Sequence, residues 1–348
     1  MHGYDSMYNF QNLYNAHLAA RRGKRYKTDV IQFEMNLAQN LCILKESLAD
    51  RTYTPQGYFH FTIHDPKTRL IYAPSYADRV VQHCLCDNII MPTLETRLIY
   101  DNAACRLDKG THFSLYRLSG FMRRHYSRFG ANGFFLKCDV HKYFETIDHA
   151  ILKQKLLRVF DDSDSLTLMF RIIDSFENTP GKGLPLGNQT SQWFALLYLD
   201  AVDRLIKEKL GIKHYVRYMD DFVLLHNDKA YLQECLCKVK ATFKEDLLLD
   251  LNKKTQICPI KNGVSYLGWH LYLTDSGKVV RKLMTSAKNR TKRRFRRMKN
   301  DYADGSRNLD DIKRSLTSTH GHLIHGHTYK LRKALWNRLI LVRHKQSC

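Results

Sequence analysis

The sequence predicts an α+β fold in which helices surround antiparallel strands, and three observations support this. Residues 214–218 and 222–226 read as two short apolar strands on either side of the acidic pair Asp220-Asp221, which indicates a β-hairpin. Residues 194–206 instead carry apolar side chains at intervals of three and four, which is typical of a helix. The chain shows no internal repeat, so we expect a mixed fold rather than a regular alternation of strand and helix.

The remaining elements follow from hydrophobic periodicity and from turn residues along the chain. A turn at 65–68 separates the first two strands, and Asp148 has the position of a helix N-cap. The expected helices cover 1–50 (with a basic break at 21–25), 76–90, 150–160, 194–206, 231–247 and most of 281–345. The expected strands cover 58–64, 69–73, 134–139, 214–218, 222–226 and 265–273. We divide the chain into an N-terminal helical extension (1–57), a central mixed region (58–274) and a basic helical region (275–348).

The composition predicts a globular protein that binds a polyanion. The 348 residues are 44% hydrophobic, and 56 Lys and Arg against 34 Asp and Glu give a formal charge of +22. An anionic membrane surface is the competing partner, but no apolar run approaches the roughly 20 residues that span a bilayer. The N-terminus lacks the pattern of a signal peptide, and the nine scattered cysteines contain no Cys-x-x-Cys. We therefore expect a cytoplasmic protein with reduced thiols.

Three aspartates are the candidate catalytic residues. Asp220 and Asp221 fall at the tip of the expected hairpin, and Asp139 ends the apolar strand 134–139. A solvated turn is the ordinary interpretation of an Asp-Asp pair, and a water-exposed strand end is that of Asp139. Adjacent carboxylates repel each other, however, and a bridging divalent cation relieves that repulsion. Strands of one sheet could gather all three, as two-metal phosphoryl transfer requires.

Seven ordered segments resemble the reverse transcriptases of bacteria and retroelements. Each is weak alone, but their order and spacing are specific. The two central segments are 137–148, which contains Asp139, and Tyr218-Met-Asp-Asp221. The other segments are 67–72 with 78–82 (one block), 104–112, 183–192, 251–255 and 266–268.

The resemblance implies a right-hand polymerase, with fingers and palm around the sheet and a helical thumb after it. It implies RNA-directed DNA synthesis with two Mg²⁺ ions, an RNA template, a DNA or RNA primer and dNTP substrates. Asp139, Asp220 and Asp221 would hold the metals with help from the Val140 carbonyl, and Lys254 would protonate the departing pyrophosphate.

The same resemblance implies which residues contact the substrates. Phe144 would be an aromatic gate beneath the sugar of the incoming nucleotide, and ordinary core packing is the alternative for this ring. The implied nucleotide-binding residues are Arg69, Arg79, Val140, Phe144 and Gln192. The implied template- or primer-binding residues are Arg106, Tyr266, Leu267 and Gly268.

Two residues point to a subfamily. Many relatives read Gln-Gly-x-x-x-Ser-Pro where this chain reads Leu186-Gly-Asn-Gln-Thr-Ser-Gln192, which resembles the reverse transcriptases of diversity-generating retroelements. Those enzymes copy a template-repeat RNA with frequent errors at adenines, and they work with an oligomeric accessory variability protein. A reverse transcriptase of a group II intron, a retron or an antiphage defence system remains open. So does a catalytically idle RNA-binding scaffold, although the intact acid triad argues against it.

The region after residue 280 predicts a nucleic-acid contact. Residues 281–299 hold ten basic residues and no acid, with Phe295 among them. A solvated helix face is the usual alternative, but a run of like charges without acids repels itself, and we favour phosphate binding. We name four of its members the thumb basic cluster: Lys292, Arg293, Arg296 and Arg297.

Four histidines follow at 320, 322, 325 and 327. On a helix, the first and last share one face while the middle two share another, so a single metal ion could not collect all four. Polar packing or contact with a duplex is the interpretation we favour.

Overall fold

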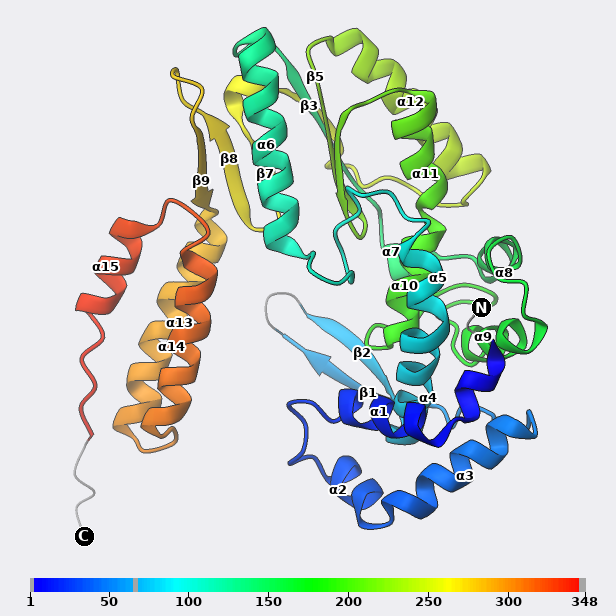
Figure 1. Ribbon diagram of the computed structural model, residues 1–348. Coiled ribbons are helices and arrows are strands. Elements are labelled where there is room, and N and C mark those ends of the chain that lie inside the picture. The colour runs from blue at the N-terminus through cyan, green and yellow to red at the C-terminus, as the bar shows by residue number, and fades with distance from the viewer. Residues whose placement is uncertain (1–2, 65–67, 344–348) are drawn as a thin grey trace.

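The computed structural model describes residues 3–64 and 68–343, and its centre is a four-stranded antiparallel sheet (Figure 1). The strand order is β4-β5-β3-β6, with β3 (Phe134–Asp139) paired to both β5 (Asp221–His226) and β6 (Gln256–Pro259). β4 (His214–Tyr218) pairs with β5 and forms the outer strand on that side. The hairpin and the strand 134–139 predicted from the sequence are confirmed.

Each face of this sheet is covered because side chains alternate along its strands. Phe135, Val223 and Leu225 pack on one face with α6 (Thr111–Phe129). Leu136 and Phe222 point to the other face, where α12 (Lys229–Glu245) packs. The central sheet is therefore buried on both sides, which fixes the position of the turn at its end.

The fingers are built from the hairpin β1 (Tyr58–Ile63) and β2 (Arg69–Pro74), shown in lighter blue in Figure 1. Ser75 caps α4 (Tyr76–Leu85), which continues through a π-helical turn (Cys86–Ile90) into α5 (Met91–Glu95). Residues 65–67 of the predicted turn lie outside the described residues. The N-terminal extension forms α1 (Phe10–Ala20), α2 (Thr28–Met35) and α3 (Leu37–Ala49), and α1 and α2 pack against α4.

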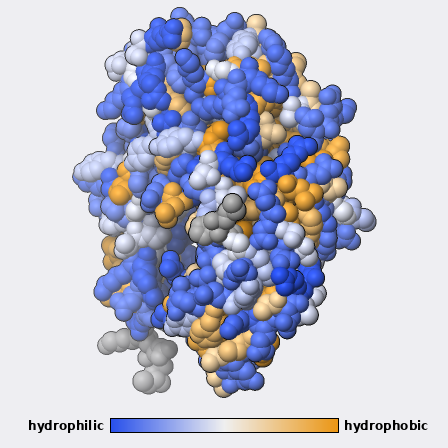
Figure 2. Space-filling model, turned by 45° about the vertical axis from the view of Figure 1, so that its right-hand side comes forward, coloured by the Kyte–Doolittle hydropathy of each residue, from blue (hydrophilic) through white to orange (hydrophobic). Residues whose placement is uncertain are grey.

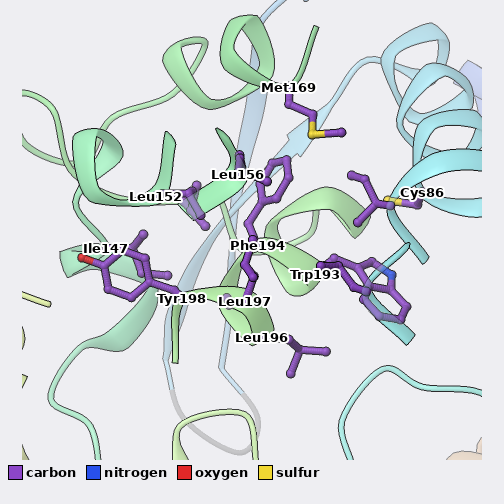
Figure 3. Packing of buried hydrophobic residues seen from close by; sticks show 14 of the residues in the cluster. Cys86, Ile147, Leu152, Leu156, Met169, Trp193, Phe194, Leu196, Leu197 and Tyr198 are labelled. Atoms are coloured by element: carbon purple, nitrogen blue, oxygen red, sulfur yellow. The ribbon is translucent and has the colours of Figure 1, made fainter. Parts of the chain in front are cut away.

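The largest core lies between these fingers helices and the palm. Asp148 caps α8 (His149–Leu157), as predicted, and α9 (Ser163–Asp174) packs beside it. Figure 3 shows how α10 (Gln189–Tyr198) places Phe194 toward Leu156 and Met169. The single helix predicted over 194–206 is wrong, because α10 ends at Tyr198, and α11 (Asp200–Arg204) and a π-helical turn (Leu205–Lys209) follow after Leu199.

The thumb joins the palm through a second small sheet, β7 (Val264–Tyr266), β8 (Trp269–Leu273) and β9 (Val279–Leu283). β9 pairs with β8 across the boundary that we placed at 274/275, so the helical region begins later than predicted. Its helices are α13 (Thr285–Ala303), α14 (Leu309–Leu323) and α15 (Tyr329–Asn337), which stand to one side of the fingers in Figure 1.

Two histidines, His322 in the last turn of α14 and His325 just after it, pack where thumb and palm meet. The His325 ring stacks on His112 of α6 with ring centroids 3.6 Å apart, and its Nδ1 lies 3.0 Å from the Tyr116 hydroxyl. His322 contacts both His112 and the buried Trp269. Polar packing therefore accounts for these two residues.

The surface is mostly hydrophilic, with hydrophobic residues in small patches on the face that Figure 2 shows. Among the helices described here, none is both long and apolar enough to cross a membrane.

Candidate active site

The acidic turn is a strained two-residue hairpin loop. Tyr218 pairs with Asp221, so Met219 and Asp220 alone close the hairpin, and Met219 has a φ of 55°. A non-glycine residue in this left-handed region costs free energy and persists only where its surroundings hold it.

Arg217 provides that support. Its guanidinium has no solvent exposure and donates 2.9 Å to the carbonyl oxygen of Met219. The same group pairs with the buried Asp203 of α11, from Nη2 to Oδ2 at 2.6 Å and from Nε to Oδ1 at 2.7 Å. The Tyr215 hydroxyl also donates to Asp203, at 2.6 Å. A buried ion pair of α11 and β4 thus fixes the turn that carries Asp220.

The sheet brings Asp139 opposite Asp221 in the register of β3 and β5. On the other side of Asp139, its carbonyl accepts from the backbone N–H of Asn252 at 2.7 Å, and His141 N–H donates to the Asp250 carbonyl at 2.8 Å. These two bonds form an isolated antiparallel bridge between Val140 and Leu251, and the Val140 carbonyl takes no part in either bond. The exposed Lys254 follows Asn252 by two residues, so its loop is bonded directly to the end of β3.

The electrostatics of the acids favour a bound cation. Burial raises the pKa of Asp221 to about 7. The positive charge of Lys137 lowers this pKa, whereas the negative charges of Asp139 and Asp220 raise it further. Burial is also the main cause that raises the pKa of Asp220, whereas the charge of Arg69 lowers it. The Asp221 Oδ1 atom is buried, and none of the residues that the structure describes forms a hydrogen bond with it. A carboxylate in this position is costly without a cation.

The acids form a donor set of the kind that magnesium prefers, but they are not preassembled around an ion. Across the described parts of the chain, no three acidic, histidine or cysteine side chains are placed to hold a metal ion together. Lys137 Nζ instead lies 3.6 Å from Asp221 Oδ2 and partly balances its charge. Metal binding therefore requires these side chains to reorient, while the backbone register stays.

The predicted nucleotide contacts divide into two groups. Arg69 is exposed on β2, and its charge lowers the pKa of Asp220. Phe144 is half-buried in α7 (Tyr143–Thr146), which follows β3. Arg79 lies elsewhere: it pairs with Asp29 at 3.3 Å and lines a small cavity of about 120 Å³ together with Gln192.

Arg106 does not fit its predicted role. All of its donors are used inside the protein, on the Glu95 carboxylate and on the carbonyl oxygens of Glu95, Ile99 and Asn102. Its residue exposure is 9%. Arg106 therefore anchors the loop before α6 and has no donor left for a template.

The predicted primer contact is restricted to a turn. Tyr266 is fully buried and its hydroxyl lies 2.7 Å from Ser114 Oγ, so its side chain cannot reach a primer. Leu267 and Gly268, both with positive φ, form the turn between β7 and β8. Burial is the main cause that raises the pKa of Tyr266, and the negative charge of Asp221 is the next.

All four members of the thumb basic cluster are exposed on α13. Arg297 has a loose pairing with Asp301 at 3.8 Å, while Phe295 and Met298 on the same helix face the thumb core. The helix thus separates an apolar inner face from a basic outer one.

A palm sheet with paired acids on a hairpin tip, between fingers and a helical thumb, defines a nucleic-acid polymerase of the right-hand type. The sequence matches the family model "Reverse transcriptase (RNA-dependent DNA polymerase)" over residues 63–271, more than half of the chain. The chain belongs to the reverse transcriptase family, which confirms the predicted resemblance and the enzyme class at this level.

Individual relatives are distant. The chain is 22% identical to protein YkfC of Escherichia coli K12 over 279 residues, which cover 68% of this chain and 72% of that protein. Among solved structures it resembles telomerase of Candida albicans in complex with a fragment of telomeric RNA, with a TM-score of 0.52, 14% identity and 82% of this chain covered. Telomerase of Candida tropicalis gives a TM-score of 0.51 at 12% identity and covers 67% of this chain. The chain spans 56% and 46% of those two telomerase chains, and the likeness confirms the right-hand fold.

Proposed function

We propose that this protein extends a primer along an RNA template by two-metal phosphoryl transfer. The observation that carries the proposal is the register that sets Asp139 opposite Asp221, with Asp220 in the turn held by Arg217. These acids would hold two magnesium ions, which supply charge neutralisation at the reacting phosphate and activate the primer hydroxyl.

The other residues of the site have separate tasks in this proposal. Arg69 contacts the triphosphate, because it is exposed on the fingers strand next to Asp220. Phe144 lies beneath the sugar, and its ring leaves no room for a 2′-hydroxyl. Lys254 donates a proton to the pyrophosphate from a loop bonded to the Asp139 carbonyl. Leu267 and Gly268 contact the primer strand through the turn between β7 and β8.

Primer extension with Asp220→Asn tests the proposal. The variant keeps size and hydrogen bonding but removes one metal-binding charge, so extension should fall by several orders of magnitude. RNA binding should persist, because the basic thumb is unchanged. Asp246→Asn, a matched change at an exposed aspartate at the end of α12, should behave like wild type. Extension by Asp220→Asn within tenfold of wild type would refute the site.

We further propose that the enzyme serves a diversity-generating retroelement and misincorporates opposite template adenines. The support is Leu186 in the loop before α10 and Gln192 in the first turn of that helix, which begins at Gln189. This loop packs against the fingers strand, since a Cβ on Gly187 would lie 3.1 Å from the Tyr72 carbonyl oxygen. The Gln192 Oε1 atom accepts a hydrogen bond from Cys105 Sγ at 2.9 Å. An apolar side chain at 186 and this amide in place of the proline of many relatives would loosen the pocket for the new base pair.

Sequencing of cDNA made in vitro tests this subtype, with and without a candidate accessory variability protein. Wild type should show errors concentrated at adenines, and Leu186→Gln and Gln192→Ala should reduce that excess. An error spectrum no richer at adenines than at other bases, in both conditions, would contradict the retroelement subtype and leave the polymerase assignment intact.

A further inference from the structure

A second candidate site lies at the end of the palm sheet opposite the acids. A cavity of about 490 Å³ opens between the last turns of α6, the start of β4 and the end of β5. In Figure 1 this is the upper end of α6 and β5. His226 ends β5 and Asp221 begins it, so five residue steps of roughly 3.4 Å separate the cavity from the catalytic turn by about 17 Å.

The cavity is lined by cations without acids. Arg124, Arg128 and Lys213 line it, and its ten lining residues include no carboxylate. The nearby cations Arg117 and Lys207 both pair with Asp101, whereas among the described residues Arg124, Arg128 and Lys213 have no ion-pair partner. The guanidinium of Arg124 lies 5.1 Å from the Phe121 ring centroid and that of Arg128 lies 5.2 Å from Phe129. Aromatic contacts of this kind hold the cations in place without neutralising them.

Three histidines complete the lining: His125, His214 and His226. The His214 ring stacks on Phe121, and no described residue forms a hydrogen bond with it. Burial, followed by the charges of Arg124, His125 and Lys207, lowers the pKa of His214 to about 4. Protonation of His214 is therefore unfavourable in this positively charged cavity, whereas binding of an anion would be favoured there.

We propose that this cavity binds a phosphodiester of an RNA strand outside the catalytic cleft. Arginine forks match phosphate oxygens, and stacking aromatic or imidazole rings beside them suit single-stranded nucleic acid. The volume is in the range of small-ligand sites and accommodates one nucleotide unit. Because the cavity lies at the far end of the sheet, the bound segment is not the base pair being extended. The inference rests on the proposed function, since it assigns a second contact with the RNA that the enzyme copies.

The test is binding of a labelled single-stranded RNA oligonucleotide to full-length protein whose cleft is saturated with a short template–primer. The cavity variant combines Arg124→Gln, Arg128→Gln and Lys213→Gln. The control variant combines Arg123→Gln, Lys209→Gln and Lys244→Gln, which removes the same charge from exposed positions outside the cavity.

The cavity variant should bind the oligonucleotide at least about tenfold more weakly. Loss of three phosphate contacts to a single strand should reduce the slope of log affinity against log salt by about 2. The control variant should lose little affinity. Equal losses in both variants, or unchanged affinity in the cavity variant, would overturn the proposal.

Two further measurements distinguish inorganic phosphate from RNA as the ligand, and the cavity site from the proposed polymerase function. Inorganic phosphate is titrated alone; if it binds in the cavity while RNA affinity does not depend on the three cations, the RNA proposal is overturned. Primer extension on a short template–primer should stay within about twofold of wild type in the cavity variant, because a phosphate contact 17 Å away changes binding and not chemistry. A wild-type protein that binds RNA in the cavity but extends no primer would refute the proposed function and leave the cavity site standing.

Discussion

Replacing Asp203 by asparagine should destabilise the protein and loosen the turn that carries Asp220. The change leaves the Arg217 guanidinium, which has no solvent exposure, without its counter-charge. Removing one partner of a buried pair typically costs about 3–5 kcal/mol. For 348 residues that unfold in one transition, an unfolding entropy near 0.7 kcal/mol/K converts this loss to a fall in Tm of about 4–7 °C. Calorimetry or circular dichroism measures the shift.

An exposed ion pair provides the matched control. Lys238 and Glu234 are 2.6 Å apart on α12, and their side chains are 52% and 54% exposed. Such pairs contribute about 0.5 kcal/mol or less, so Lys238→Gln should change the Tm by less than about 1 °C. If Asp203→Asn melts no lower than Lys238→Gln, the buried pair does not stabilise the palm as argued.

The double variant Arg217→Met/Asp203→Leu separates stability from catalysis. Replacing both charges by apolar side chains should restore most of the lost stability, because no buried charge remains unpaired. The hydrogen bond to the Met219 carbonyl is still lost, so primer extension should remain well below wild type. A double variant that is both stable and fully active would show that the turn does not depend on Arg217.

Three other perturbations test separate parts of the molecule. Phe144→Ala should raise the use of ribonucleotides relative to deoxyribonucleotides in primer extension, and an unchanged ratio in an active variant would place Phe144 in the ordinary core. Changing the thumb basic cluster to glutamine should weaken duplex binding and reduce the slope of log affinity against log salt by up to about 3. Identical slopes would mean that this helix face is solvent-exposed in the complex and does not contact phosphate. Burial, with Lys24 and Arg79, lowers the pKa of His83 to about 4, so the unfolded state takes up the proton first as the pH falls. The contribution of His83 to the free energy of unfolding should be fully present above pH 6.5 and should be lost as the pH falls toward 4. In urea unfolding, His83→Gln should make this decline with pH shallower. Parallel curves of unfolding free energy against pH for the two proteins would contradict this.

The hairpin of β4 and β5, which carries Asp220 and Asp221, could be predicted from the sequence because its signal is local. Apolar strands on both sides of Tyr218–Asp221 define the turn without knowledge of any partner. Asp139 was expected at a strand end for the same reason, and the register confirms that it faces Asp221. Family resemblance then supplied roles that the residues alone do not show.

The support of the turn could not be predicted, because it depends on a contact between elements. Arg217 is a charged residue in an apolar strand, which was a usable signal of a buried partner. Nothing local identifies that partner as Asp203, since the sequence predicted one continuous helix through Leu199. The same limit applies to Arg106, whose basic character indicated nucleic acid but whose partners are Glu95 and three carbonyl groups.

The position of β3 in the sheet has a consequence for biosynthesis. This apolar strand is completed at residue 139, but its two neighbours are β5 and β6, and β6 ends only at Pro259. At a translation rate of about 5–20 residues per second, roughly 6–25 s pass before both edges can be covered. During that interval Phe134–Asp139 offers unpaired backbone groups and exposed apolar side chains, which favour aggregation. The strand that carries Asp139 therefore depends on protection from chaperones, and slower translation or the absence of nascent-chain chaperones should lower the yield of folded enzyme.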